Sequence, residues 1–239
     1  MVSELIWEDL QLGGLQILQN KKGYKFTSDA VILANFVNAK GQNVVEFCFG
    51  SGIISTLIAH KENPNKIWGF EIQENVYNQA LLSIEKNNLA NIITLFNQDN
   101  KNAKEILKDE KIDVVVVNPP YKKLESGKLP FEEEIAISKA EVKTNLTEIV
   151  ESAKALLSTN GKLYICLNPE RLDELILVLE KNKFAVKEMF FSYPNTFSQA
   201  SCVFVMAKKD AKQGMKVLPP LITHNDKGDY VAIIKELFK

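Results

Sequence analysis

Short runs of β-branched and aromatic residues alternate with stretches of helical periodicity along most of this chain, and that alternation constrains the fold more than any other feature. Seven runs predict strands, over 44–49, 66–71, 91–96, 112–117, 162–167, 185–191 and 201–207. Apolar residues at helical spacing between them predict helices over 53–61, 75–89, 146–157 and 170–181. Because strands and helices that alternate in this way form right-handed βαβ crossovers, we expect a doubly wound α/β fold.

The strands differ in their expected surroundings. Those at 44–49 and 112–117 are almost continuously apolar, which is typical of central parallel strands covered on both faces. The last two, 185–191 and 201–207, have no convincing helix between them and are expected to form a hairpin. We therefore predict a seven-stranded, mostly parallel sheet with one antiparallel strand from this terminal hairpin.

The length of 239 residues is compatible with one large α/β domain, and we expect a single domain over 1–239. Residues 1–40 precede the first core strand and would form an N-terminal extension of a hairpin and a helix. Residues 41–208 would form the Rossmann-like core. Residues 209–239, which are rich in lysine and contain two consecutive prolines, would form a tail that packs on the core.

The extension and the tail each carry local signals. Two short strands are expected within 10–19, on either side of Gly13-Gly14, followed by a helix from Ser28 to Val37 with Ser28 or Asp29 as its N-cap. In the tail, an extended segment is expected to lead into a short helix over 230–237.

The composition excludes several classes of protein. With 46% hydrophobic and 25% charged residues, the chain is neither intrinsically disordered nor a coiled coil. No apolar stretch approaches the ~20 residues of a membrane span, and the first residues do not resemble a signal peptide, so a cytoplasmic protein is expected. The three cysteines lack CxxC spacing and the two histidines lie far apart, which favours buried thiols and no metal site.

A glycine turn and an acidic residue indicate a nucleotide site. The first core strand runs through Glu46 into a turn that contains Gly50 and Gly52, and glycines there allow the backbone to approach a ligand closely. A tight strand-to-helix turn without a ligand is the alternative. The second strand ends at Glu71, 21 residues after Gly50, near where a nucleotide-binding fold holds ribose hydroxyls.

The third and fourth strands add two further polar groups. Asp99 follows the third strand, where it could accept a hydrogen bond from an adenine amine or simply be a solvated loop residue. The fourth strand ends in Asn118-Pro119-Pro120-Tyr121, in which two prolines fix the backbone and remove its donors. An amide oxygen, a free carbonyl and an aromatic ring thus converge, and a plain turn is rarely built in this way. The long segment 122–144 follows directly, at the strand end where α/β proteins bind ligands.

Together these motifs resemble those of class I S-adenosylmethionine-dependent methyltransferases, and NPPY resembles the subset that methylates planar exocyclic nitrogens. Three further segments, 25–33, 169–172 and 219–221, are similar to the bacterial tRNA1(Val) (adenine-37-N6)-methyltransferase family. The resemblance covers nearly the whole chain. It implies a Rossmann-like fold, S-adenosyl-L-methionine as the cofactor, and the anticodon loop of a tRNA as the partner.

The resemblance also implies roles for individual residues. The residues that would bind the cofactor are Thr27, Asp29, Glu46, Gly50, Gly52, Glu71, Asp99 and Asn118. Asn118, Pro119 and Tyr121 would hold and activate the target base, with no need for a cysteine nucleophile or a metal. The chain departs from the family at Glu46 and Cys48, where relatives usually have Asp and Gly.

RNA contacts are expected from lysines, because the chain has a net charge of −1 and Arg171 is its one arginine. The candidates lie around the NPPY edge, with solvated surface charge as the alternative: Lys122, Lys123, Lys128 and Lys139.

Other functions stay open at this point. A release-factor glutamine N5-methyltransferase also uses NPPY but has a helical N-terminal domain, and a DNA adenine methyltransferase normally has a separate recognition domain. Methylation of N6 of adenine or N2 of guanine in another RNA is a further alternative. A non-catalytic nucleotide-binding module is the alternative from a different class, and the intact NPPY argues against it.

Overall fold

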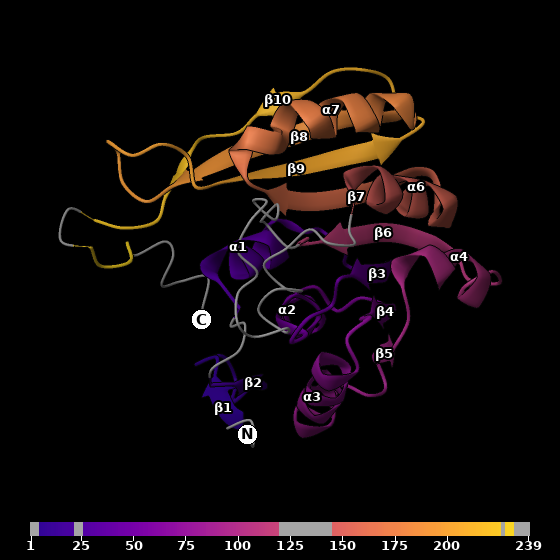
Figure 1. Ribbon diagram of the computed structural model, residues 1–239, viewed down its shortest axis with the longest axis vertical. Coiled ribbons are helices and arrows are strands. Elements are labelled where there is room, and N and C mark those ends of the chain that lie inside the picture. Colours follow the sequence, from indigo (N-terminus) through magenta and orange to yellow (C-terminus); the bar gives the residue numbers. More distant parts are fainter. Residues whose placement is uncertain (1–4, 22–25, 120–144, 226–227, 232–239) are drawn as a thin grey trace, which may run out of the picture.

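A nine-stranded sheet forms the centre of the computed structural model, which describes residues 5–21, 26–119, 145–225 and 228–231 (Figure 1). Eight strands lie side by side in the order β10 (Lys216–Val217), β8 (Phe184–Tyr193), β9 (Cys202–Lys209), β7 (Leu157–Leu167), β6 (Ile112–Val117), β3 (Asn43–Phe47), β4 (Lys66–Phe70) and β5 (Ile93–Phe96). The ninth, β11 (Leu221–Ile222), also pairs with β8. Within the sheet, β9 is antiparallel to both of its neighbours, and the other pairs are parallel.

The doubly wound, mostly parallel sheet and its terminal hairpin confirm the sequence prediction. The sheet has two more strands than the seven expected, because residues of the tail pair with β8. Without the tail, β8 would be an edge strand whose unpaired N–H and C=O groups face solvent. Two-residue strands of this kind leave no periodic signal in the sequence.

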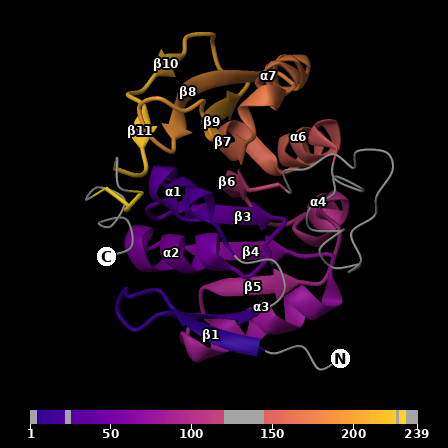
Figure 2. The same ribbon diagram turned by 60° about the vertical axis from the view of Figure 1, so that its left-hand side comes forward.

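Helices cover both faces of the sheet (Figure 2). One face carries α1 (Ser28–Phe36), α2 (Ile53–Glu62) and α3 (Glu74–Lys86), and the other carries α4 (Ala103–Ile106), α6 (Leu146–Leu156) and α7 (Leu172–Lys181). Two 3-10 turns, η1 (Asn100–Asn102) and η2 (Pro169–Arg171), precede α4 and α7.

Successive residues of the central strands pack into two separate cores. In β6, Val114 and Val116 belong to the core under α1 and α2, whereas Val115 and Val117 belong to the core under α6 and α7. All four valines are completely buried. This double burial explains the four consecutive valines of the strand, since neither face can accept a polar side chain at these positions.

The N-terminal residues form a separate two-stranded antiparallel sheet, β1 (Leu5–Asp9) and β2 (Gln16–Asn20). The turn between them contains Gly13 and Gly14, both at positive φ. Because the turn also includes residues 10–12, the first strand lies earlier in the chain than predicted. The hairpin is attached to α3, where the Ser83 hydroxyl accepts a hydrogen bond from the backbone N–H of Leu18 at 2.9 Å.

Two local predictions need correction. The N-cap of α1 is Thr27 and not Ser28 or Asp29, because Thr27 keeps extended backbone angles while the helix begins at Ser28. The tail helix does not begin at Tyr230, which forms an isolated bridge with His224 instead. Residues 232–237 of that expected helix lie outside the described residues.

All three cysteines are free thiols, with Cys166 and Cys202 buried and Cys48 half-buried. None of the helices in the described ranges has the length and apolar character required to cross a membrane.

Candidate active site

The register of the sheet brings four strand ends to one edge. Phe47 of β3 pairs with Phe70 of β4 and with Val117 of β6, and Phe70 pairs with Phe96 of β5. The residues that follow these four therefore line the carboxyl edge of the sheet, among them Glu71 and Asn118. This is the edge at which open α/β sheets bind ligands.

The turn after β3 is closed by the acid at the end of β4. Cys48, Gly50 and Gly52 all have positive φ, and Gly52 is the N-cap of α2. A Cβ atom at Gly52 would lie 2.6 Å from the Phe49 ring, so glycine is required there for space as well as for conformation. The N–H of Gly50 donates to Oε2 of Glu71 at 2.9 Å. The 21-residue spacing seen in the sequence thus corresponds to a direct contact.

The Glu71 carboxylate is almost completely buried and holds two backbone donors. Oε1 accepts from the N–H of Gln73 at 2.9 Å, and Oε2 accepts from Gly50. Burial nevertheless raises the pKa of Glu71 above its usual range, with the hydrogen bonds acting in the opposite direction.

Glu46 lies deeper in the same region and is 1% exposed. Its Oε2 accepts hydrogen bonds from both the N–H and the hydroxyl of Ser55, at the start of α2. Burial, together with the charge of Glu71, raises the pKa of Glu46 to about 8. Ser55 is not part of any motif in the sequence analysis; the signal that could have found it is a serine on the apolar face of a predicted helix, where a buried hydroxyl needs a polar partner.

Cys48 is not a nucleophile in this arrangement. Burial, reinforced by the nearby carboxylates, raises the pKa of its thiol to about 12, so the reactive thiolate is not formed near neutral pH. Asn100 donates a hydrogen bond to its sulfur at 3.6 Å. The same electrostatic neighbourhood contains Glu46, Glu71 and Asp99, which brings three of the sequence candidates together.

The remaining cofactor candidates lie at two helix starts. Asp99 caps η1, where its Oδ1 accepts from the N–H of Lys101 at 3.0 Å. Asp29 lies in the first turn of α1, and burial raises its pKa to about 6 while a hydrogen bond with Thr27 acts in the opposite direction. The described contacts of Asp29 link it to Thr27 and not to Glu46 or Glu71.

Asn118 has a partner that the sequence did not indicate. The thiol of Cys166 in β7 donates to Oδ1 of Asn118 at 3.2 Å, and Cys166 is completely buried. Val117 pairs with Ile165 in the sheet, so the residues that follow each of them lie side by side. Pro119, directly after Asn118, is buried.

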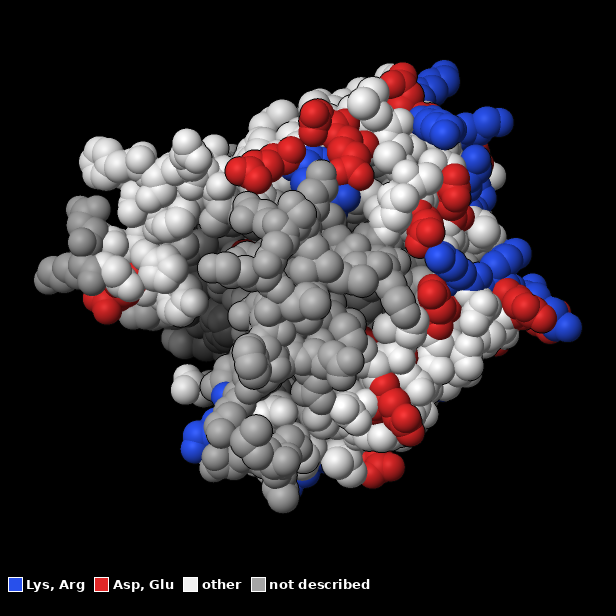
Figure 3. All heavy atoms as spheres, in the orientation of Figure 1, with Lys and Arg blue, Asp and Glu red and all other residues white. Residues whose placement is uncertain are grey.

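The other predicted site residues lie outside the described residues. These are Tyr121, Lys122, Lys123, Lys128 and Lys139. On the described surface in the view of Figure 3, basic and acidic side chains are intermixed and do not form one continuous basic face.

The sheet order, the antiparallel strand beside its end and the glycine turn closed by an acid define the Rossmann-like fold of class I methyltransferases. The chain belongs to the methyltransferase small domain family, whose sequence model matches residues 26–184. That match contains the glycine turn, Glu71, Asp99 and Asn118.

Relatives of the chain carry a more specific name. The chain is similar to the tRNA1(Val) (adenine(37)-N6)-methyltransferase of Christiangramia forsetii, with 26% identity over 150 residues. It is also similar to the protein of the same name from Flavobacterium psychrophilum, with 24% identity over 229 residues. The first match spans 61% of each chain, less than two thirds of that relative's length, and the second spans 93% of this chain and 95% of the relative.

Solved structures share the fold at low sequence identity. A predicted O-methyltransferase of Agrobacterium tumefaciens, Atu636, gives a TM-score of 0.69 at 18% identity and covers 87% of this chain and 94% of that chain. TYW2 of M. jannaschii, solved in complex with AdoMet, gives a TM-score of 0.59 at 15% identity and covers 87% of each chain.

Proposed function

We propose that this protein transfers a methyl group from S-adenosyl-L-methionine to the exocyclic N6 of an adenine in tRNA, at position 37 of the anticodon loop of tRNA1(Val). The observation that carries the proposal is the position of the Asn118-Pro119 pair. It follows β6 at the same edge as Glu71, so an amine held by Asn118 would lie beside a nucleotide held by Glu71. The names of the relatives support the choice of substrate. Such a substrate would place the enzyme in the cytoplasm.

The chemistry of the site fits a cationic nucleotide cofactor. Glu71 would bind the two ribose hydroxyls, and Asp99 would bind the adenine amine. Glu46 and the turn at Gly50 and Gly52 would lie at the methionine end, with Thr27 and Asp29 closing the site from α1. Glu46 and Glu71 are buried acids with raised pKa, and a positive group beside them would stabilise their charged forms. The cofactor would supply a methyl group on a positively charged sulfonium.

Asn118 and Pro119 would act on the acceptor amine. The lone pair of an exocyclic adenine nitrogen is delocalised into the ring and is therefore a poor nucleophile. If Oδ1 of Asn118 and the carbonyl of Pro119 each accept one N6 hydrogen, the lone pair is turned toward the methyl group. Orientation and electrostatic stabilisation then supply the catalysis.

The target base must leave its stack to reach this site, which costs a few kcal/mol and least for an unpaired loop base. Stacking on Tyr121 would return about 1–3 kcal/mol. The phosphates would be contacted by Lys122, Lys123, Lys128 and Lys139. Each contact would add about 0.7–0.9 to the magnitude of the slope of log binding constant against log salt concentration.

The test is to incubate the protein with methyl-labelled cofactor and total tRNA from cells that lack the modification. Digestion to nucleosides and mapping of the label should give N6-methyladenosine at position 37 of one tRNA, and labelling should be at least about a hundredfold slower with Asn118→Ala. Label in the N2 of guanine, or in a release-factor glutamine supplied in parallel, would overturn the choice of acceptor. Tight cofactor binding without transfer to any RNA or protein would indicate a binding module instead.

A further inference from the structure

Cys166 contacts the amide oxygen of Asn118 from the neighbouring strand. Its thiol donates a hydrogen bond to Oδ1 of Asn118 at 3.2 Å. The two residues are 48 positions apart in the chain, and they come together because Val117 of β6 pairs with Ile165 of β7, one residue before each of them. The contact therefore depends on the register of two parallel strands and not on the NPPY motif itself.

The amide group of an asparagine is not oriented by its own torsional preferences. The torsion that turns the amide is broad and does not select one staggered position. The amide oxygen accepts hydrogen bonds and the amide nitrogen donates them, so rotation of the amide changes which of the two faces a target amine. A hydrogen bond from a fixed donor to Oδ1 of Asn118 limits this rotation.

Cys166 is itself held in a closely packed part of the core. Its side chain is completely buried, and it pairs with Phe204 of β9 in the sheet. Phe204 stacks on Phe190 of β8 with 4.7 Å between ring centroids, and Phe36 of α1 packs edge-on against Phe190 and Tyr164. Because closely packed side chains have little room to change rotamer, the thiol approaches Asn118 from a fixed direction.

We propose that Cys166 is a positioning residue for methyl transfer, and that its thiol holds the amide of Asn118 in the orientation in which Oδ1 accepts a hydrogen of the target amine. The inference rests on the proposed function, because it takes Asn118 as the residue that binds the amine. A catalytic group must be held within about 0.5 Å and 10–20° of its productive geometry, and hydrogen bonds from packed side chains achieve this. The role requires no reaction at the sulfur.

A second buried thiol in the same core provides a matched control. Cys202 of β9 is 1% exposed, belongs to the same hydrophobic core as Cys166 and donates to the carbonyl of Val203 at 3.7 Å. Strand β7 separates β9 from β6, so Cys202 does not lie beside Asn118 in the sheet. Replacement of either cysteine by alanine removes the same group from the same core, and a positioning role distinguishes the two variants.

The first measurement follows the Asn118 amide directly, by NMR of isotope-labelled protein. The side-chain amide signals of Asn118 are identified by their absence from the spectrum of Asn118→Ala. Cys166→Ala should shift or broaden these signals, since the amide is then less restricted, and Cys166→Ser should restore them toward the wild-type positions because it keeps a donor. Cys202→Ala should leave them unchanged. Asn118 signals that do not respond to Cys166→Ala would overturn the inference.

The second measurement is a double-mutant cycle on the single-turnover rate of methyl transfer. Cys166→Ala should lower the rate about two- to tenfold in the wild-type background and less than about twofold in the Asn118→Ala background, because the amide that it would position is then absent. Cys202→Ala should lower stability without lowering the rate. Equal effects of Cys166→Ala in the two backgrounds would show that the thiol acts through packing alone, and the inference would be wrong.

The two measurements distinguish this inference from the proposed function. If the wild type methylates no acceptor while the Asn118 signals respond to Cys166→Ala and recover in Cys166→Ser, the control of the amide by Cys166 stands and the proposed function fails. If the wild type methylates adenine in tRNA while either the Asn118 signals or the cycle show no coupling to Cys166, the proposed function stands and Cys166 is not a positioning residue.

Discussion

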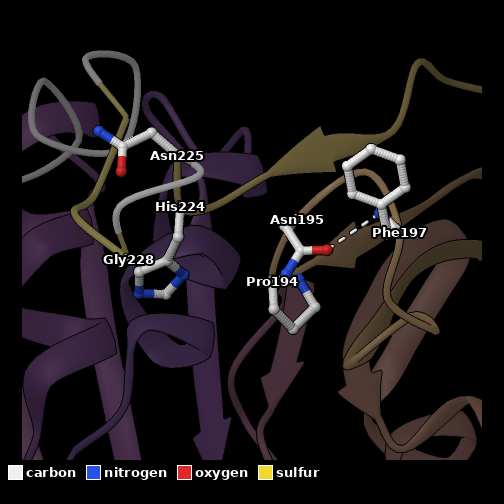
Figure 4. Close-up of a pocket in the computed structure, with 6 residues that line it drawn as sticks. All are labelled: Pro194, Asn195, Phe197, His224, Asn225 and Gly228. Carbon is white, nitrogen blue, oxygen red and sulfur yellow. Dashed lines mark hydrogen bonds between the residues drawn. The ribbon is translucent and has the colours of Figure 1, made fainter.

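The two ends of the carboxyl edge have opposite chemistry. At β3 and β4, Glu46 and Glu71 are buried carboxyl groups whose pKa values are raised by burial. Beyond β8, a cleft opens beside the turn that joins β8 to β9 (Figure 4). The lining residues that the structure describes are aromatic or neutral, and Phe197 is almost completely exposed. A buried acid without a cation is stabilised by the arrival of positive charge, whereas an exposed neutral ring is stabilised by being covered. The difference supports the proposal that the cationic cofactor binds at the acidic end, with Asn118 following β6 beside it.

The largest expected effect is that of Asn118→Ala on the rate of methylation. Asn118→Ala should lower the rate of methylation about 10²–10³-fold, because loss of one preorganised polar contact costs roughly 2.7–4 kcal/mol in a comparable catalytic role. Cofactor affinity, measured by calorimetry, should change far less than the rate, since the other residues expected to bind the cofactor, the glycine turn and Glu71 among them, are intact. Wild-type turnover by this variant would remove NPPY from the chemistry.

The next largest expected effect is that of Glu71→Ala on the affinity for the cofactor. Glu71→Ala should weaken binding of S-adenosylmethionine by at least about tenfold, because hydrogen bonds to a charged group contribute about 1.5–3 kcal/mol each. Asp99→Ala should weaken it less, since Asp99 is partly exposed. Phe197→Ala should leave calorimetric affinity for the cofactor unchanged. Equal losses from Glu71→Ala and Phe197→Ala would break the division between the two ends.

The free energy of unfolding should depend on pH through Glu46 and should not depend on pH through Phe197. The pKa of Glu46 is about 8 in the folded protein against 4.5 for an ordinary glutamate, so the folded state binds more protons than the unfolded state between these values. Stability without ligand should therefore fall as pH rises from ~5 to ~8, by at most about 1.4 kcal/mol per pH unit from this group. Urea unfolding of Glu46→Gln should show a shallower dependence, while Phe197→Ala should follow the wild type.

The smallest effect is expected at Cys166, which positions Asn118 from β7. Cys166→Ala removes a hydrogen bond contributing about 0.5–1.5 kcal/mol, so kcat should fall roughly two- to tenfold with little change in KM. Cys166→Ser keeps a donor and should recover most of the loss. A fall in stability without any change in kcat would show that the thiol only fills space.

Much of the fold followed from local signals in the sequence. Strand β6 was predicted at its observed limits, and helices α2 and α6 were predicted to within one residue at each end. β6 and α2 are largely apolar segments and α6 is strongly amphipathic, so their hydrophobic pattern indicates them without tertiary information. The predictions of the N-cap of α1 and of the start of β1 were wrong. Both features depend on backbone angles that several neighbouring residues could adopt equally well.

The site divides in the same way. Sequence by itself determined the glycine turn, the acid 21 residues later and the asparagine before two prolines, because each is a short motif whose chemistry lies in adjacent residues or in the regular spacing of a βαβ unit. Only the tertiary structure decided that Cys166 contacts Asn118 across 48 residues, that burial raises the pKa of Glu46, and that the tail pairs with β8 to form a cleft beside Phe197. These features depend on strand order, register and depth of burial, which arise from contacts between distant segments and leave no periodic trace in the chain.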